Sequence, residues 1–352
     1  MDILIVGGGI VGLSIAIDLL LAGHNVKLSV RNEREGASWV AGGMLAPFSE
    51  GLEGDFLRFS VESLRLWHDY LERIKEISGI GVFFSQGILR IALTEEEERE
   101  LKEKVKRYSQ NICQNIVSYD GRELIKEFPY ITEEVRYGVI YGDEGNVDTE
   151  ELMEALYIAF KKLGGEIIGE DVVRIHKEGE KIEKVYGFFK EMVADFYIFT
   201  TGAWLKKHFN FPVFPVKGQI LRISAPFKDY VIYSSSAYII PREKDILVGA
   251  TTEHRGFDTT TTLEGVRKLT QGAIKVSPAL KEAEFFEVRV GLRPGTPDEL
   301  PIFYFGENFA VFSGHYRNGI LLAPITAEIA LKLVDKGEFS EYFKLFSPYR
   351  FK

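Results

Sequence analysis

The stretch "DILIVGGGIVGLSIAIDLLLAG" (residues 2–23) decides the fold, because it places closely spaced glycines between an apolar strand and an apolar helix. The spacing is Gly7-x-Gly9-x-x-Gly12. Gly7 permits the tight turn, Gly9 lets a pyrophosphate approach the backbone, and Gly12 lets the helix pack closely on the sheet. The helix that opens near Ile10 and Val11 directs free N–H groups and its positive dipole end toward the phosphates. The motif predicts a dinucleotide site without saying which dinucleotide.

Length and charge limit the classes of function. A chain of 352 residues with 45% hydrophobic residues is too long for one simple layer, so we expect two domains, interleaved or consecutive. A formal net charge of -9 argues against nucleic acid as a partner, because phosphate binding needs a basic face. Small molecules are the expected partners, and a homo-oligomeric assembly is left open.

Cysteine content and the apolar segments indicate the compartment. Cys113 is the single cysteine, which excludes an intramolecular disulfide and a multi-thiolate metal site, and we expect no bound metal. Asp2 stands where a signal peptide needs basic residues, so the apolar start is interpreted as a buried strand. No apolar run approaches the roughly 20 residues of a membrane-spanning helix. A cytoplasmic protein without a membrane span is therefore expected.

The strand expected at 25–30, "NVKLSV", departs from the usual dinucleotide pattern at its end. An acid normally stands there to bind the ribose hydroxyls, whereas this chain has Arg31 and Asn32. The nearest acid is Glu33, which comes late, and Asn32 could accept the same hydrogen bond without a charge. The group that replaces the missing acid stays open.

Apolar periodicity and turn residues predict the other elements. We expect a helix over 60–77, two strands over 82–93 broken at Gly87, and helices over 94–108 and 147–165. Thr94 and Asp148 are the expected caps of the last two helices, and Gly164 is the expected terminator of the second.

The second half of the chain alternates between two kinds of sheet. The segment 172–204 predicts a hairpin followed by an apolar strand that returns to the nucleotide sheet, and 213–257 predicts antiparallel strands of a separate sheet. The fold class is therefore α/β, with a Rossmann-like domain interleaved with an α+β substrate domain built on an antiparallel sheet. The expected ranges are 1–80, 141–212 and 287–352 for the nucleotide domain, and 81–140 and 213–286 for the substrate domain.

Several longer blocks carry a resemblance to a known family. They are "GASWVAGGMLAP" (36–47), "PVKGQ" (215–219), "YIIPR" (238–242), "VGATTE" (248–253), "GLRPGTPDELPIF" (291–303) and "GHYRNGILLAPITA" (314–327). In this order they resemble the glycine oxidases, which belong to the D-amino-acid oxidase group of FAD proteins and are associated with thiamine biosynthesis. The resemblance spans nearly the whole chain. It implies non-covalently bound FAD, since Cys113 lies outside these blocks.

The resemblance also implies which residues hold the cofactor. Ser38 would offer its hydroxyl to the pyrophosphate, small residues would let backbone lie against the isoalloxazine ring, and Val173 would meet the adenine through its backbone. A helix that begins near Asn318 would stabilise negative charge on the flavin. The full expected set is Gly7, Gly9, Ile10, Val11, Gly12, Arg31, Asn32, Ser38, Gly42, Gly43, Met44, Val173, Gly202, Arg293, His315, Arg317, Asn318, Gly319 and Ile320.

The same resemblance implies a carboxylate clamp for the substrate. Arg293 offers a planar pair of donors, and Tyr238 adds a hydroxyl. Arg317 is the third expected catalytic residue and either orients the substrate or holds its loop, while His315 is interpreted as a structural or flavin-adjacent histidine. Thr252 and Ser236 depart from the pattern, so we expect them to change the size and polarity of the amine pocket.

The function implied by the resemblance is oxidative deamination of glycine, sarcosine or small D-amino acids. Hydride transfer from Cα to flavin N5 would give a 2-oxo acid with ammonia or an amine, and oxygen as acceptor would give hydrogen peroxide. The alternative is an amino-acid dehydrogenase, or the β subunit of a hetero-oligomeric proline or amino-acid dehydrogenase, with another acceptor. A non-catalytic nucleotide-binding protein is a third hypothesis. Substrate, stereochemical preference and oligomeric state are not predicted.

Overall fold

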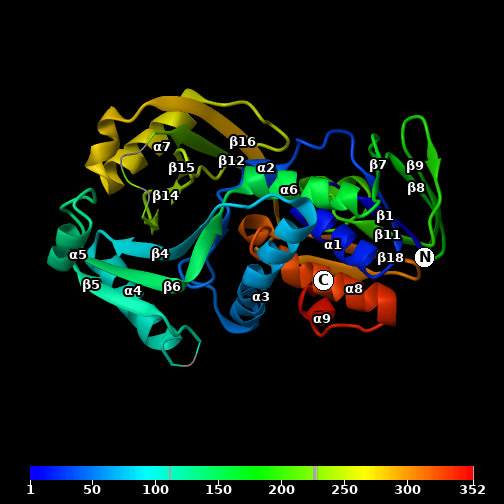
Figure 1. The fold of residues 1–352 in the computed structure, drawn as a ribbon, viewed down its shortest axis with the longest axis horizontal. Helices are drawn as coiled ribbons and strands as arrows, with labels where there is room; N and C mark the ends of the chain where they lie inside the picture. The colour runs from blue at the N-terminus through cyan, green and yellow to red at the C-terminus, as the bar shows by residue number, and fades with distance from the viewer. Residues whose placement is uncertain (111, 225–226, 228, 352) are drawn as a thin grey trace.

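The computed structural model describes residues 1–110, 112–224, 227 and 229–351, and its strands form two large sheets and one small sheet. The six-stranded sheet has the order β17-β18-β11-β1-β2-β7, and a second sheet has nine strands. Figure 1 shows these two sheets toward opposite ends of the long axis, with the chain crossing between them several times. The predicted α/β fold with an interleaved antiparallel sheet is confirmed.

The six-stranded sheet is parallel around the N-terminal strand. β1 (Asp2–Val6) lies between β2 (Asn25–Ser29) and β11 (Phe196–Phe199), and both pairings are parallel. The further strands are β7 (Glu166–Ile168), β18 (Phe309–Ser313) and the antiparallel edge strand β17 (Ile302–Phe305). The expected strand at 25–30 and the return of the chain after 172 are therefore confirmed.

Both faces of this sheet are covered, which explains why its central strands are continuously apolar. Ile3 and Ile5 pack in one core with three helices, α1 (Ile10–Leu21), α6 (Thr149–Lys162) and α8 (Ala323–Lys336). Leu4 and Val6 pack on the other face against a small sheet. That small sheet consists of β8 (Arg174–Glu178), β9 (Lys181–Tyr186) and β10 (Glu191–Met192).

The nine-stranded sheet is antiparallel except where β13 meets β4. Its strands are β3 (Met44–Leu45), β4 (Phe84–Ala92), β5 (Ile116–Asp120), β6 (Tyr137–Val147), β12 (Phe214–Ile223), β13 (Val231–Tyr233), β14 (Tyr238–Pro241), β15 (Ile246–Gly249) and β16 (Phe285–Gly295). The antiparallel strands expected between 213 and 257 are therefore confirmed.

Two details of the sequence prediction are corrected by this sheet. The segment 82–93 forms one strand, β4, because Gly87 with φ +91° produces a register shift between Gln86 and Ile88 instead of a break. The expected domain boundaries at 141 and 287 fall inside β6 and β16, which pair along their lengths within the nine-stranded sheet. The division into domains stays a proposal, with its last boundary moved to the end of β16.

The remaining helices include the two whose caps the sequence predicts. Thr94 caps α4 (Glu95–Tyr108) by accepting from the N–H of Glu97, and Asp148 caps α6 in the same way. The other helices are α2 (Ala37–Val40), α3 (Gly54–Ser78), α5 (Gly121–Glu127), α7 (Leu263–Val276) and α9 (Tyr342–Leu345), with 3-10 turns η1 (Gly202–Lys207), η2 (Pro278–Glu282), η3 (Tyr316–Asn318) and η4 (Pro348–Phe351).

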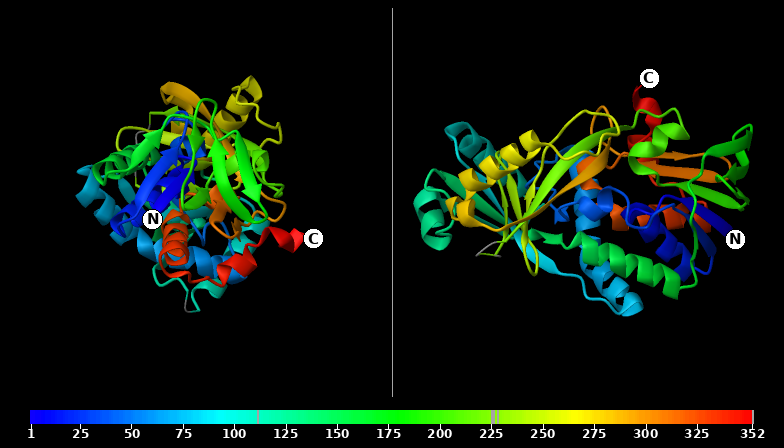
Figure 2. Two further views of the ribbon diagram at one scale, coloured as in Figure 1. Left: turned by 90° about the vertical axis from the view of Figure 1, so that its right-hand side faces the viewer. Right: turned by 90° about the horizontal axis from the view of Figure 1, so that it is seen from above.

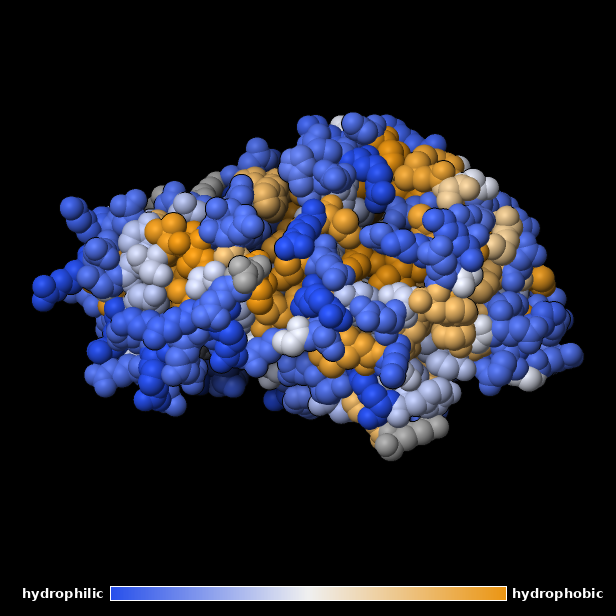
Figure 3. Space-filling model, turned by 90° about the horizontal axis from the view of Figure 1, so that it is seen from below, coloured by the Kyte–Doolittle hydropathy of each residue, from blue (hydrophilic) through white to orange (hydrophobic). Residues whose placement is uncertain are grey.

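The helices that cover the six-stranded sheet run alongside its strands, as the two further views of Figure 2 show. Figure 3 shows one face of the molecule, on which apolar patches lie between hydrophilic side chains. Among the described residues, no helix is long and apolar enough to cross a membrane.

Candidate active site

The glycine-rich turn between β1 and α1 has the geometry of a phosphate cradle. Gly7 has φ +116°, which only glycine adopts without strain, and a Cβ on Gly9 would lie 3.3 Å from the Oγ of Ser38. The backbone of Gly12 packs so closely that a Cβ there would lie 2.1 Å from the Gly7 carbonyl oxygen. The open side of the turn therefore faces Gly9, and Gly12 serves the packing of the helix.

A long cavity begins at this turn and runs between the two large sheets. The predicted residues that line it are Gly7, Gly9, Ile10, Val11, Arg31, Asn32, Ser38, Gly42, Gly43, Met44, Gly202, Tyr238, Arg293, His315, Arg317, Asn318, Gly319 and Ile320. They come from segments that are far apart in the sequence, and the tertiary structure brings them to one surface.

Two predicted cofactor residues lie outside this lining. Gly12 is the first, because it is used in helix packing. Val173 is the second: its N–H donates to the carbonyl of Tyr186 at 2.8 Å, and its side chain is 46% exposed. The adjacent Val172 is buried and lines the cavity. The lining thus contains the residue before Val173, because the side chains that precede β8 alternate between the core and the surface.

The next question is which acidic side chain lies at the polar end of the cavity, where a ribose-binding acid is expected. Glu33 lies outside the lining and pairs with Lys161 at 3.0 Å, so it is not available. Glu35 lines the cavity, 2.9 Å from a guanidinium nitrogen of Arg31, and Asp171 is also in the lining. Asn32 donates to Glu35 and accepts from a backbone N–H, which fixes its amide. Glu35 and Asp171 are thus the two carboxylates of the lining that the sequence reasoning missed.

The cavity fits a dinucleotide carrying a flat ring system. The Oγ of Ser38 accepts from the N–H of Ile10 at 3.0 Å, which leaves its own hydroxyl proton for a ligand at the mouth of the turn. A Cβ on Gly42 would lie 2.3 Å from the terminal Cδ1 of Ile240, so a larger residue there would displace that side chain. Thr201 lines the cavity with a buried Oγ1 that has no hydrogen-bond partner among the described residues.

The segment 315–320 forms part of the cavity wall. His315 is 3% exposed, its Nε2 lies 3.2 Å from the Oγ1 of Thr326, and burial lowers the pKa of its imidazole to about 3. A neutral, fixed imidazole is a structural element here. The helix expected near Asn318 is corrected to the short turn η3, and the long helix α8 begins only at Ala323 because Pro324 suits its first turn.

Arg293 and Tyr238 meet on the wall formed by the nine-stranded sheet. The Nη1 of Arg293 donates to the carbonyl of Thr251 at 3.1 Å, and Gly218 leaves the space that the guanidinium occupies. Burial raises the pKa of Tyr238, and the nearby charge of Arg293 and a hydrogen bond with it oppose that rise. Arg293 and a neutral Tyr238 thus present converging donors to the cavity, which is the arrangement that holds a carboxylate.

Arg317 belongs to a different pairing within the same cavity. Its Nη2 lies 2.7 Å from the Oε2 of Glu50, whose side chain is 6% exposed. Burial alone would lower the pKa of Arg317, but the Glu50 carboxylate raises it. Sequence reasoning missed Glu50, although it lies just beyond the "GASWVAGGMLAP" block.

The two residues expected to change the amine pocket do not line the cavity. Thr252 is exposed, and Ser236 is held in a turn by a hydrogen bond from its N–H to the Oγ of Ser234. Ala250 and Ile220 are in the lining instead. Ser236 and Thr252 lie outside the strands, because β14 begins at Tyr238 and β15 ends at Gly249.

The chain belongs to the FAD dependent oxidoreductase family (DAO), whose family model matches residues 2–333. Its relatives include proteins named bifunctional ThiO/ThiG and glycine oxidase. The protein from Synechocystis sp., "Bifunctional protein ThiO/ThiG", is 32% identical over 99% of this chain and 54% of the relative. "Glycine oxidase" of Geobacillus kaustophilus is 30% identical over 96% of this chain and 93% of the relative.

The structure agrees with that of one of these relatives. The crystal structure of glycine oxidase from Geobacillus kaustophilus superimposes with a TM-score of 0.93 and 27% identity, covering 98% of this chain and 97% of that chain. The chain spans about half the length of the ThiO/ThiG relatives. The FAD-dependent class and the fold expected from the sequence are confirmed.

Proposed function

We propose that this protein oxidatively deaminates glycine or another small amino acid with bound FAD. The observation that carries the proposal is the converging pair Arg293 and Tyr238, which faces the same cavity as the glycine-rich turn. A carboxylate held by this pair would place the rest of a small amino acid toward Gly42 and Gly43. The glycine oxidase relatives support this class of substrate.

The side chains of this chain bind and orient the substrate. The Arg293 guanidinium takes both carboxylate oxygens, and the Tyr238 hydroxyl donates to one of them. His315 stays neutral at the wall and is not placed to move a proton. Bound FAD supplies the two-electron acceptor for oxidation at Cα. Orientation provides most of the rate, because a held substrate reacts from a separation of about 3 to 3.5 Å.

The products in this proposal are a 2-oxo acid and ammonia, or an amine when the substrate nitrogen is alkylated. Oxygen is the proposed final acceptor, which gives hydrogen peroxide. The relatives named ThiO/ThiG support a proposed link to thiamine biosynthesis.

An anaerobic titration tests this function. The purified yellow protein is mixed in turn with glycine, sarcosine, D-alanine, D-proline and L-proline, and the flavin absorbance is followed. We expect the small amino acids to bleach the flavin first, and air to restore the colour with formation of peroxide.

Three outcomes of the titration would replace the proposal. Bleaching by L-proline alone would favour a proline dehydrogenase. Recovery with an artificial acceptor but not with air would favour a dehydrogenase with another acceptor. A flavin that no amino acid bleaches would favour a nucleotide-binding protein without turnover.

A further inference from the structure

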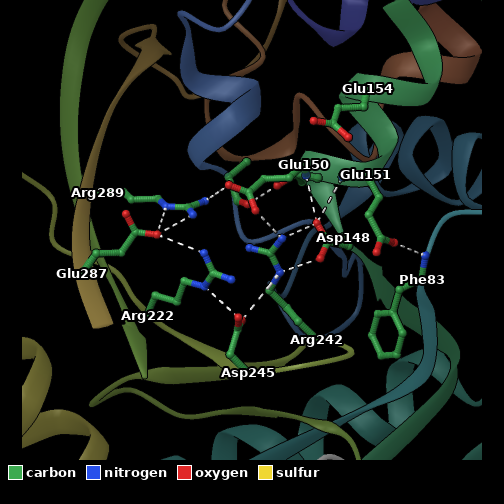
Figure 4. Close-up of polar contacts among 12 residues, drawn as sticks. Phe83, Asp148, Glu150, Glu151, Glu154, Arg222, Arg242, Asp245, Glu287 and Arg289 are labelled. Carbon is green, nitrogen blue, oxygen red and sulfur yellow. Dashed lines mark hydrogen bonds and ion pairs between the residues drawn. The ribbon is translucent and has the colours of Figure 1, made fainter. Parts of the chain in front are cut away.

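The first turn of helix α6 and its cap carry two carboxylates that bind arginines from the nine-stranded sheet (Figure 4). The Nε of Arg242 lies 2.6 Å from one oxygen of Asp148, and its Nη2 contacts the other. The same Nη2 lies 2.8 Å from the Oε2 of Glu150, whose Oε1 binds Arg289. Glu150 therefore bridges two guanidinium groups.

These two arginines lie on the strands that carry the carboxylate clamp. Arg242 directly follows β14, which contains Tyr238, and Arg289 lies in β16, which contains Arg293. Alternation along β16 puts Arg289, Gly291 and Arg293 on one face of the strand. A Cβ on Gly291 would lie 3.3 Å from Val40, so α2 packs between the two arginines of β16.

Helix α6 also contacts the nucleotide side of the cavity. The hydroxyl of Tyr157 donates to the carbonyl of Gly8 in the glycine-rich turn at 2.9 Å. The Oγ1 of Thr149 donates to the carbonyl of Ala41, next to Gly42 in the cavity wall, at 2.8 Å. One rigid helix thus touches the phosphate cradle, the wall beside the ring position and, through its first turn, both clamp strands.

The pair of Arg242 and Asp148 is buried, and Glu150 lies at the edge of the network. The side chains of Arg242 and Asp148 are each 6% exposed, that of Arg289 is 17% exposed and that of Glu150 is 32% exposed. Ion pairs in water contribute little, whereas buried pairs fix geometry because an unpaired charge there is costly. Without Glu150, the guanidinium groups of Arg242 and Arg289 would lose the carboxylate that they share.

We propose that Glu150 is a positioning residue that sets the distance between the substrate clamp and the flavin, acting through Arg289 on β16 and Arg242 after β14. The proposal rests on the proposed function, since the clamp is defined by its substrate. A displacement of about 1 Å at the reacting centre can cost about 100-fold in rate. Glu150 itself does not line the cavity.

The test compares Glu150→Gln with Glu154→Gln. Glu154 stands on the same helix and pairs with Arg34 at 3.0 Å, away from the clamp strands, so it is the matched control. The readouts are the limiting rate of anaerobic flavin reduction, the Kd of the non-reducing carboxylate glycolate from flavin spectral shifts, and the Tm. We expect Glu150→Gln to lower the limiting rate at least tenfold and raise the glycolate Kd severalfold, with FAD retained.

The outcomes separate this proposal from the proposed function. A Glu150→Gln variant with the rate and glycolate Kd of Glu154→Gln, changed only in Tm, would show that the network is merely structural. Wild-type protein that no amino acid reduces would overturn the proposed function, while the glycolate comparison would still test the positioning. Should Glu150→Gln not fold, Arg289→Gln removes the Glu150 contact on β16 together with the contacts of Arg289 to Glu287, and it is expected to give the same loss.

Discussion

Arg317 and Glu50 form an ion pair within the wall of the cavity, with Nη2 and Oε2 2.7 Å apart. Arg317 is thereby held by a carboxylate of the chain, whereas the Nη1 of Arg293 donates to a neutral group, the Thr251 carbonyl, and Arg293 also forms a hydrogen bond with Tyr238. Arg293 and Arg317 therefore have different partners in the cavity wall, and we expect substitutions beside each of them to have different effects.

Replacement of Glu50 by glutamine should tighten the binding of a carboxylate. The variant removes a negative charge that lies beside Arg317 and is felt by Tyr238, so the potential in the cavity becomes more positive. We expect the Kd of glycolate to fall severalfold, measured by flavin spectral shifts at low salt. Glu299→Gln is the control, because Glu299 lies 4.0 Å from Arg317 and is 61% exposed. Equal effects of both variants would contradict the assigned pairing.

Replacement of Arg293 by methionine should leave FAD bound and weaken the substrate. A hydrogen bond to a charged group contributes about 1.5–3 kcal/mol. We expect kcat/KM for the preferred amino acid to fall by at least the factor that corresponds to this free energy. Arg293→Lys should recover little, because an ammonium cannot donate in two parallel directions. Unchanged kinetics with bound flavin would reassign Arg293 to the structural hydrogen bond with Thr251.

Two substitutions in the glycine-rich turn should separate the effect on FAD binding from the effect on folding. Gly9 has φ -77°, so Gly9→Ala causes no backbone strain and only fills space in front of Ser38. We expect the Gly9→Ala protein to bind FAD more weakly than the wild type, while the Tm of the apoprotein stays unchanged. Gly12→Ala would place a Cβ 2.1 Å from the Gly7 carbonyl and should lower the apoprotein Tm as well.

Gly81→Ala is the matched control for both variants, because a Cβ there meets no heavy atom within 4 Å. It should change neither the FAD affinity nor the Tm. A Gly9→Ala protein that binds FAD as tightly as the Gly81→Ala protein would show that the pyrophosphate does not approach this turn.

Because of Glu144, we expect the free energy of unfolding to fall as the pH rises. Burial raises the pKa of its carboxyl to about 8, although the N–H groups of Phe48 and Ser49 and the Ser49 hydroxyl oppose the rise. The unfolded chain has a pKa near 4.5, so the folded state holds an extra proton between these two values. The contribution of this proton to the free energy of unfolding is fully present below pH 4.5. Between pH 4.5 and about pH 8 it falls by about 1.4 kcal/mol per pH unit.

The measurement for Glu144 is urea unfolding at pH 5 and pH 9 for the wild type and Glu144→Gln. Glutamine resembles the protonated acid and does not titrate, so the wild type should lose stability relative to the variant at the higher pH. A free-energy difference that is the same at both pH values would show that Glu144 is already ionised in the folded protein.

The cofactor should be released by acid. Cys113 is 4% exposed, outside the cavity lining, and burial raises the pKa of its thiol to about 12, so it is a poor nucleophile. We expect trichloroacetic acid to leave FAD in the supernatant and a colourless pellet. A yellow pellet would show a covalent link and contradict this prediction.

The sequence predicted much of the fold because the deciding signals are local. The spacing of Gly7, Gly9 and Gly12, the apolar strand before them, and caps such as Thr94 depend on residues within a few positions of each other. Errors arose where a local signal had two interpretations. Gly87 could end a strand or bend it, and only pairing with β6 selected the bend.

The roles of the predicted site residues stay predictions, although Arg293, Tyr238 and the segments around Ser38 and Asn318 do line one cavity. Val172 lines this cavity and Val173 does not, since neighbouring residues of an extended chain point to opposite sides. The backbone contact of Val173 with the adenine stays a prediction.

The sequence by itself determined that this chain binds a dinucleotide in an α/β fold, because a strand, a glycine turn and a helix are sufficient to build the phosphate cradle. Only the tertiary structure decided that Glu35 and Asp171 line the cavity, that Glu50 pairs with Arg317, and that Glu150 joins Arg242 to Arg289. The physical reason is that the energy of an ion pair depends on the distance between the two charges and on their burial. These pairs join segments that are far apart in the sequence, and no local sequence pattern indicates that the segments meet.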